Sequence, residues 1–388
     1  MPLRESDKLF DHYCAFPRKM GSWVPARIGS ALQTWRNLYF HGERKLSNSH
    51  KDSLQSSLIL RHNSDMSTST KPPYDKELAP ILPQLLAQLS MPSELHVDML
   101  PKLRSTQQVT AQDVIGSRPV EYEELTISGP NGDILIAILR PTNSKAKPNG
   151  RSGIYNIHSG GMIMGNRYTL LEESLDWVVE FDAICITPEY RLAPEHPDPV
   201  PVEDCYAVLQ WIGTHLEELD INPERLMIAG ASAGGGLAAG VALLARDRGG
   251  PALCAQVLQC PMLDDRCTSI SAKQFSRGGL WDNQTNITGW TALLGDRRAT
   301  DSVSIYAAPN RAIDLTGLPP TFIDVGSAEV FRDEDVQFAS KLWACGVEAE
   351  LHVWPGGFHG FSGLVKTQKL SQLAIQSRNA WVKRMLLQ

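Results

Sequence analysis

The chain has 388 residues, of which 42% are hydrophobic and 21% are charged, and its formal net charge is −6 with a pI near 5.9. This composition is typical of a globular protein, and because no basic stripe stands out, nucleic acid is not an expected partner. No apolar run reaches the roughly 18 residues that a membrane helix needs, and the best candidate, residues 238–245, is short enough to be a buried helix.

The first 65 residues differ in charge from the rest of the chain. They carry ten Lys and Arg against six Asp and Glu, and the polar stretch 62–73 that follows has the composition of a linker. We therefore predict a flexible N-terminal extension over 1–70, short helices over 71–115 and the main body over 116–388. The amphipathic piece at 31–40 can lie either on the body or on a membrane surface.

The seven cysteines include no CxxC pair, a pattern that predicts small buried thiols in a reducing compartment. The N-terminal stretch MPLRESDKLFDHYCAF lacks an apolar signal core, and its acidic residues weaken a transit-peptide interpretation. We therefore expect a cytoplasmic protein without stable membrane insertion.

Strand-like and helix-like segments alternate through the main body. The predicted strands cover residues 120–128, 133–141, 152–159, 183–190, 225–232, 255–263, 320–327 and 348–356. Several are apolar without polar alternation, as in strands buried on both faces of a largely parallel sheet. Helix-like segments such as 201–216 and 335–346 lie between them. This pattern predicts an open α/β sheet, with a ligand site beyond the carboxyl ends of the strands.

A glycine pair follows the third predicted strand. In the stretch YNIHSGGMIMG, Gly160 and Gly161 stand directly after His158 and Ser159. Paired glycines let the backbone turn so that two amide groups face one point, as the binding of an oxyanion requires. An ordinary strand-end turn is the alternative. We expect His158 to hold this loop by a hydrogen bond rather than to act as a base.

The stretch RLMIAGASAGGGLAAG places Ser232 between an apolar strand and a helix rich in small residues. A serine on so sharp a turn is a candidate nucleophile, and glycines two positions away on either side let the strand and the helix approach closely. The amide of Ala233 is a third candidate oxyanion donor. A phosphate-binding turn or a tight packing corner is the alternative, although the Lys of a P-loop and the G-x-G-x-x-G spacing are missing.

Ten histidines compete for the role of general base. His359 stands in the Gly-rich loop of VWPGGFHGF, after the last predicted strand, where an imidazole can swing toward the serine. A generic loop histidine is the alternative. Five acids precede it within IDVGSAEVFRDED, residues 323–335, so that serine, acid and histidine follow in the chain order of Ser-Asp/Glu-His hydrolases.

The five acids of this stretch have different expected roles. Asp324 lies inside a predicted strand, where we expect a hydrogen-bonded structural role. Asp333, Glu334 and Asp335 open a helix, where acids favour the helix dipole and Asp333 is a candidate N-cap. A metal site is not expected, because no histidine or cysteine stands nearby at ligand spacing.

Several motifs in this order resemble the hormone-sensitive-lipase-like branch of the α/β-hydrolase superfamily, over roughly residues 75–385. They are HSGG (158–161), EYRLAPEHP (189–197), GASAGG (230–235), GSAEVFRDE (326–334) and PGGFHGF (355–361). The resemblance implies an α/β-hydrolase fold, with a mostly parallel eight-stranded sheet flanked by helices. It also implies a catalytic core over 116–388 and a helical cap from the N-terminal helices at 71–115 and from a segment at about 268–300.

The resemblance further implies a carboxylesterase-like or lipase-like serine hydrolase, acting on carboxylic esters of short to medium acyl chain without a cofactor. By position, Ser232 is the nucleophile, His359 the base, and Gly160, Gly161 and Ala233 the oxyanion donors. Glu329 follows a strand end where the triad acid belongs, although relatives often carry aspartate there, and Asp333 is the alternative acid. Ser159 replaces the first glycine of the HGGG motif of the family, and the extension has no counterpart in it.

Four apolar residues are candidate walls of the acyl pocket, with ordinary core packing as the alternative: Met162, Met164, Leu280 and Trp281. The expected partner is a small-molecule ester, and a homodimer through the last strand is left open. The same triad also serves an acyltransferase, a lactonase or an amidase, because the machinery is shared. A non-catalytic ligand receptor on this fold is a further alternative.

Overall fold

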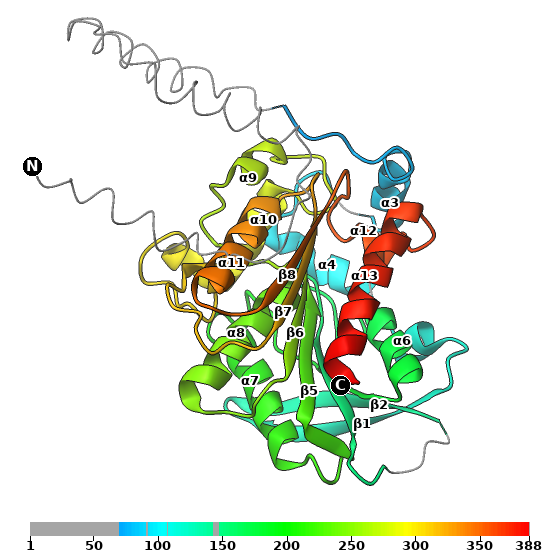
Figure 1. Cartoon of the computed structure of the whole chain (residues 1–388). Coiled ribbons are helices and arrows are strands. Elements are labelled where there is room, and N and C mark those ends of the chain that lie inside the picture. The colour runs from blue at the N-terminus through cyan, green and yellow to red at the C-terminus, as the bar shows by residue number, and fades with distance from the viewer. Residues whose placement is uncertain (1–69, 91, 107, 143–146, 388) are drawn as a thin grey trace, which may run out of the picture. The chain divides into compact units, whose positions relative to one another are not determined.

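The computed structural model describes residues 70–90, 92–106, 108–142 and 147–387 (Figure 1). The chain divides into two units, Met1–Thr68 and Ser69–Gln388, and the first lies outside the described residues. The predictions of a flexible extension and of an amphipathic piece at 31–40 therefore fall on a part of the chain that is not described.

The described residues form an eight-stranded sheet in the order β1-β2-β4-β3-β5-β6-β7-β8. Only β1 with β2 and β2 with β4 pair antiparallel, and the other neighbours are parallel. All eight predicted strands are confirmed: β1 (Val120–Gly129), β2 (Gly132–Pro141), β3 (Arg151–Ile157), β4 (Ile184–Pro188), β5 (Ile221–Ala231), β6 (Ala255–Gln259), β7 (Thr321–Gly326) and β8 (Ala349–Trp354). The α/β-hydrolase fold expected from the motifs is thus present.

Helices cover both faces of the sheet, which explains the apolar runs of the central strands. In β5, Met227 packs in the core formed with α6 (Glu172–Phe181) and α13 (Lys369–Leu386). Its neighbour Ile228 packs on the opposite face. That face is covered by α7 (Val200–Thr214), α8 (Ala233–Arg248) and α11 (Arg332–Ala344), which Figure 1 shows on the other side of the sheet from α6 and α13.

The shorter helices gather mainly around the end of the sheet at which the central strands finish. Figure 1 shows α3, α4, α9 and α10 there. The bounds are α3 (Leu82–Gln88), η2 (Val97–Met99), α4 (Leu100–Thr106), α5 (Ala111–Ile115), α9 (Ile270–Gln274), α10 (Asn283–Leu294), η3 (Gly295–Arg297), η4 (Pro309–Arg311) and α12 (Phe361–Leu364). The segments predicted to form a cap, 71–115 and about 268–300, are therefore helical in part.

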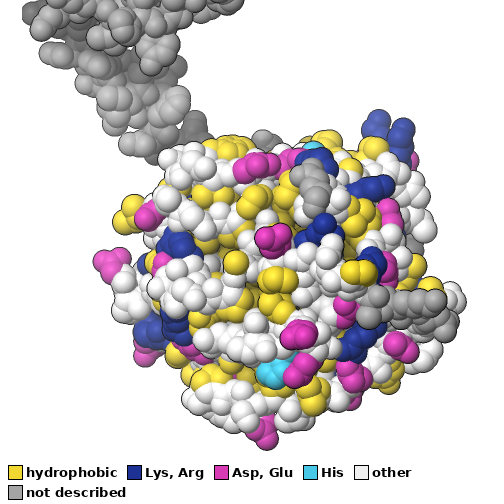
Figure 2. Space-filling view, turned by 60° about the horizontal axis from the view of Figure 1, so that its bottom comes forward, with side chains coloured by type: hydrophobic (Ala, Val, Ile, Leu, Met, Phe, Trp, Pro, Cys, Tyr) yellow, Lys and Arg dark blue, Asp and Glu magenta, His cyan; other side chains and the backbone are white. Residues whose placement is uncertain are grey.

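The surface of the second unit mixes charges of both signs. On the face that Figure 2 shows, Lys and Arg side chains lie among Asp and Glu, and neither sign gathers into a block. None of the helices in the described part of the chain is both long and apolar enough to span a bilayer.

A buried arginine joins three elements beneath the carboxyl ends of the strands. Arg378 of α13 is fully buried and pairs with Glu173 of α6. It also donates to Asp324 Oδ2 of β7 at 2.8 Å, and the indole of Trp354 donates to the same oxygen at 3.0 Å. The predicted structural role of Asp324 as a hydrogen-bonded strand residue is confirmed.

We expect Arg378→Met to lower the free energy of unfolding by about 3–5 kcal/mol, because it leaves the carboxylates of Glu173 and Asp324 buried without a counter-charge. Arg384→Met on the same helix is the matched control. Its ion pair with Glu350 is partly exposed, so we expect a change of less than about 1 kcal/mol. Urea titrations of the two variants measure both values, and equal losses would contradict this account of the buried pair.

Candidate active site

Ser232 lies on the turn between β5 and α8. Its backbone has φ 54° and ψ −121°, a strained conformation for a residue with a Cβ. Two hydrogen bonds hold the turn: the Ser232 amide donates to Gln259 O at 2.8 Å, and the Met262 amide donates to Ser232 O at 2.9 Å. The strain is therefore maintained by β6 and the segment that follows it.

Glycines on both sides of Ser232 permit this turn. A Cβ on Gly230 would lie 2.3 Å from Gly234 O, and a Cβ on Gly234 would lie 2.1 Å from Ile157 O. No side chain fits at such distances, so both positions require glycine. The same contact with Ile157 brings the end of β3, and the loop that follows it, against the start of α8.

His359 connects the serine to an acid. It stands in the loop after β8 and is 8% exposed. Its Nε2 lies 3.0 Å from Ser232 Oγ, and its Nδ1 lies 2.8 Å from Glu329 Oε2. The ring of Phe331 packs edge-on against the imidazole, with 5.1 Å between the ring centroids. The imidazole is thereby held with one nitrogen toward the serine and the other toward the acid.

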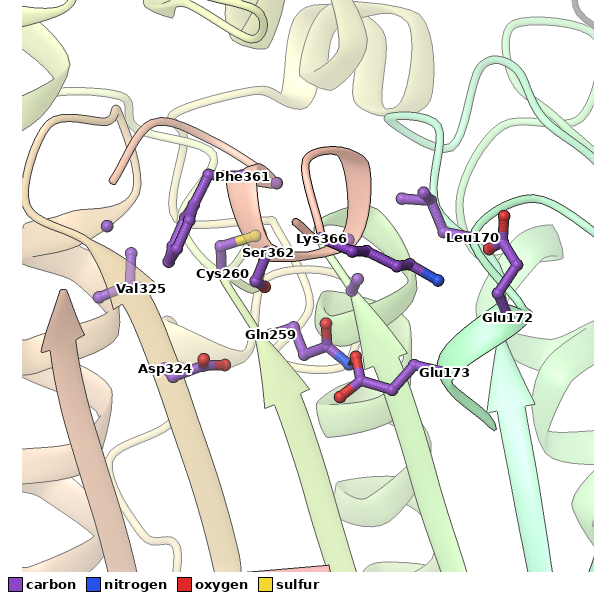
Figure 3. A pocket seen from close by; sticks show the side chains of 14 residues that line it. Leu170, Glu172, Glu173, Gln259, Cys260, Asp324, Val325, Phe361, Ser362 and Lys366 are labelled. Atoms are coloured by element: carbon purple, nitrogen blue, oxygen red, sulfur yellow. Dashed lines mark hydrogen bonds between the residues drawn. The ribbon is translucent and has the colours of Figure 1, made fainter. Parts of the chain in front are cut away.

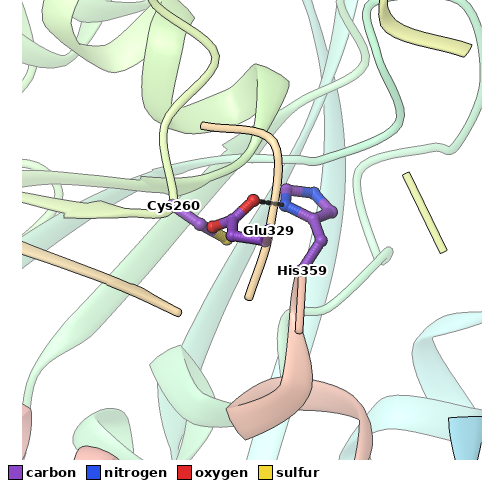
Figure 4. A group of neighbouring side chains, drawn as sticks. All are labelled: Cys260, Glu329 and His359. Atoms are coloured by element: carbon purple, nitrogen blue, oxygen red, sulfur yellow. Dashed lines mark hydrogen bonds and ion pairs between the residues drawn. The ribbon is translucent and has the colours of Figure 1, made fainter. Parts of the chain in front are cut away.

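Glu329 is the acid in this position. It follows β7, is 2% exposed, and accepts a further hydrogen bond from the Phe331 amide through Oε2 at 3.3 Å. Its other oxygen, Oε1, is buried and has no hydrogen-bond partner among the described residues. Figure 4 shows the free side of this carboxylate beside the sulfur of Cys260.

Cys260, Glu329 and His359 each offer a metal-ligand atom, and these atoms lie within 4.8 Å of one another. We had expected no histidine or cysteine near this acid. That reason against a metal site was wrong, because the fold brings Cys260 and His359 to Glu329 from distant parts of the chain. Two of the three side chains already share the 2.8 Å hydrogen bond between imidazole and carboxylate.

The loop after β3 lies opposite Ser232. Gly160 and Gly161 have φ values of 123° and 64°, and the Gly160 carbonyl accepts from the Ile163 and Met164 amides. Within the described part of the chain, the amides of Gly160, Gly161 and Ala233 have no hydrogen-bond acceptor. These three amides are therefore available to a ligand.

Ser159 connects this loop to the turn that carries Ser232. Its side chain is buried, and Oγ donates to Ala231 O at 2.8 Å. A glycine at this position, as in the HGGG motif, would lack that bond. The serine that replaces the first glycine of the motif therefore adds a hydrogen bond between this loop and Ala231, the residue before Ser232.

His158 is a structural residue of the same loop, as predicted. Its ring stacks on Tyr190 with centroids 4.0 Å apart, and Nδ1 donates to Ser159 O at 2.8 Å. Burial lowers the pKa of His158 to about 4, so the ring is neutral at pH 7. Its carbonyl accepts a hydrogen bond from the Tyr190 hydroxyl at 3.0 Å.

A cavity of about 410 Å³, here called the main cavity, opens beside Ser232 and His359. Met164, Leu280 and Trp281 line it, as expected. Met162 does not line it, and the structure corrects this expectation: the side chain is buried in the core and lies against Gly236 of α8. Sequence reasoning missed the walls contributed by the N-terminal helices and loops: Gln88, Leu89, Ser90, Thr106, Gln108 and Val109.

A second cavity of about 30 Å³, here called the small cavity, lies beside the main one (Figure 3). Leu170, Glu172, Ala231, Cys260 and Gly360 line both cavities. The walls of the small cavity also include the buried network of Glu173, Asp324 and Ser362. Among these walls, Lys366 is the only residue with an ammonium group.

The acids that open α11 differ from expectation. The N-cap of this helix is Phe331, so the prediction that Asp333 caps it was wrong. Asp333 instead accepts from the Ser271 amide at 2.7 Å. Glu334 is buried and accepts from the Leu263 amide at 2.9 Å, and Asp335 is fully buried. Burial raises the pKa of both Glu334 and Asp335 well above the usual range.

The chain is similar to known hydrolases and esterases. The family model for the alpha/beta hydrolase fold matches residues 154–363. The carboxylesterase NlhH of Mycobacterium tuberculosis is 34% identical over 278 residues, which cover 71% of this chain and 80% of that protein. The esterase LipI of the same organism is 32% identical over 242 residues, covering 62% and 74%. The structure of a bacterial heroin esterase has a TM-score of 0.72 and 37% identity, over 79% of this chain and 98% of that one.

We expect Ser159→Ala to lower kcat for an ester several-fold, roughly threefold to tenfold, because the loop with Gly160 and Gly161 loses its link to the Ser232 turn. It also leaves Ala231 O without a partner and costs about 1 kcal/mol of stability. Ser152→Ala is the control, since the buried Ser152 Oγ likewise donates to a backbone carbonyl, Leu386 O at 3.0 Å, but at the opposite end of β3. Equal kcat values in the two variants would contradict a positioning role of Ser159.

The pH dependence of stability has a contribution from His158. Because its pKa in the folded protein is about 4, the unfolded chain binds the proton first as the pH falls. The contribution of His158 to the free energy of unfolding is fully present above the pKa of a histidine in the unfolded chain, about 6.5. It falls by about 3 kcal/mol as the pH is lowered toward 4. Urea titrations of wild type and His158→Gln at pH 7 and pH 4 measure this difference. A difference between the two proteins that is independent of pH would refute it.

Proposed function

The chain belongs to the alpha/beta hydrolase family, and on that premise we propose that it cleaves carboxylic esters through a triad of Ser232, His359 and Glu329. The observation that carries the proposal is the continuous hydrogen-bonded chain at the wall of the main cavity. It runs from Ser232 Oγ to His359 Nε2 at 3.0 Å and from His359 Nδ1 to Glu329 Oε2 at 2.8 Å.

In the proposed reaction, Ser232 Oγ attacks the acyl carbon while His359 Nε2 takes its proton. The bond to the ester oxygen then breaks, and the imidazolium gives this proton to the leaving alcohol. Glu329 holds the Nδ1 hydrogen and stabilises the imidazolium. A water molecule then loses a proton to His359 and attacks the acyl-enzyme, which releases the acid and restores Ser232.

The amides of Gly160, Gly161 and Ala233 are the proposed donors to the tetrahedral oxyanion. Their support is that they lie on the two turns that flank Ser232 and have no acceptor within the described residues. Donors fixed by the backbone stabilise developing charge without reorganisation, and the loss of one such donor typically costs ~10²–10³ in rate.

We propose that the substrate carries a short to medium acyl chain, which the main cavity of about 410 Å³ can hold. Its apolar walls include Leu89, Met164, Leu280, Trp281 and Leu364. Because residues of both 71–115 and 268–300 contribute walls, we propose that these two segments form the cap of the active site. No cofactor is needed for the proposed steps.

The proposed compartment is the cytoplasm. Its support is that the six cysteines of the described residues are all unpaired, as in a reducing compartment.

We expect Glu329→Gln to lower kcat for 4-nitrophenyl butanoate by about 10²–10⁴, because the amide cannot stabilise the imidazolium and favours the wrong tautomer. Ser232→Ala should abolish the acyl-enzyme burst. The matched control is Asp333→Asn, which should reduce stability by about 1–2 kcal/mol and leave kcat nearly unchanged.

Turnover that survives Ser232→Ala would overturn the whole mechanism. A large loss of kcat in Asp333→Asn together with a small one in Glu329→Gln would move the role of the acid to Asp333. Product analysis in the presence of butanol distinguishes hydrolysis from acyl transfer, because only transfer yields the butyl ester in preference to the free acid.

A further inference from the structure

The walls of the main cavity carry very few ionisable groups. Among the described residues that line it there is no lysine or arginine, and the only carboxylate is Glu172. His359 and Cys260 are the other titratable residues on the walls. A ligand in this cavity therefore meets amide, hydroxyl and apolar groups, one acid, and the serine with its base.

The Glu172 side chain is free to interact with a ligand. Glu172 is the first residue of α6, is half-buried, and has no ion pair or hydrogen bond to its carboxylate within the described part of the chain. The next residue, Glu173, turns into the core and pairs with Arg378. Glu173 therefore has a structural role, whereas Glu172 lies in the wall of the main cavity.

Charges behind the wall add to the negative potential. Glu173 and Asp324 are buried in the walls of the small cavity, where Arg378 pairs with both, and Glu329 is buried behind His359. Lys366 opposes them, because it lines the small cavity together with Glu172 and Glu173 (Figure 3). Burial raises the pKa of Glu173 and Arg378 opposes that rise, whereas Glu334 and Asp335 line neither cavity. With Glu172 and Lys366 included, four carboxylates face two cations.

We propose that Glu172 makes the active site select esters that carry an ammonium group, and disfavour esters that carry a carboxylate or phosphate. This inference rests on the proposed ester hydrolysis and names its substrate class. In a cavity walled mostly by apolar groups, the interaction between a carboxylate and an ammonium ion is screened less than in water. A cationic ester therefore gains binding energy that a neutral ester of the same shape lacks.

Two pairs of isosteric esters test the selection. In the first pair, choline butanoate is compared with 3,3-dimethylbutyl butanoate, so that only the charge of the alcohol differs. In the second, the 4-nitrophenyl ester of 4-(trimethylammonio)butanoic acid is compared with that of 5,5-dimethylhexanoic acid, so that only the charge of the acyl group differs. The measured quantity is the ratio of kcat/KM for the cationic and the neutral member of each pair.

We expect the kcat/KM of wild type to be about tenfold higher for the cationic member of at least one pair. The reason is the attraction between the Glu172 carboxylate and an ammonium group bound in the same cavity. Glu172→Gln should reduce that ratio about fivefold or more. Lys366→Gln should raise it, because it removes the opposing charge. The matched control is Glu180→Gln at the exposed end of α6, which removes the same charge from the same helix and should leave both activity and ratio unchanged.

A ratio that is the same in wild type and Glu172→Gln for both pairs would overturn the proposal, and so would a lower ratio in Lys366→Gln. Failure of the proposed function is distinguishable from either result. It would appear as no hydrolysis of the neutral esters, or as hydrolysis that persists in Ser232→Ala.

Discussion

Ser232 holds a positive φ between β5 and α8, and its own amide and carbonyl are bonded to the chain around β6. Every other part of the site is placed relative to this turn. Gly234 lies against the end of β3, which brings the loop with Gly160 and Gly161 close to the start of α8. Ser159 adds a side-chain bond from that loop to Ala231. The strain of one residue is thus maintained by three neighbouring strands, as strained functional residues require.

The base and the acid depend on a second set of contacts. β7 and β8 are parallel neighbours, so the loops that follow them emerge side by side and bring Glu329 and His359 into contact. Below these loops, Arg378 joins β7, α6 and the start of α12 through Asp324, Glu173 and Ser362. This buried network connects β7 and α12, which lie next to the loops that carry Glu329 and His359. It also places two carboxylates, those of Glu173 and Asp324, against one guanidinium beneath the cavities.

Some features were predictable because they depend on local order along the chain. Apolar runs bounded by turn residues located all eight strands, and the strand-glycine-serine-glycine-helix order located Ser232. The histidine loop followed from its place after the last strand. Other features were not predictable. Asp333 has the residue type of an N-cap, yet Phe331 takes that position, because the segment with Ser271 packs against the helix start and engages Asp333. Met162 looked like a pocket wall, but its side chain turns into the core against Gly236.

The sequence alone thus determined the order of the elements and singled out Ser232 and His359 as candidates, because hydrophobic periodicity and glycine spacing are properties of neighbouring residues. Only the tertiary structure decided which surfaces meet. Cys260 stands 69 positions before Glu329 in the chain and lies beside it in the fold, and helices from the N-terminal segment wall a cavity whose catalytic groups follow much later. Such contacts arise from the packing of distant segments, and no local pattern encodes the side chain that a distant segment presents.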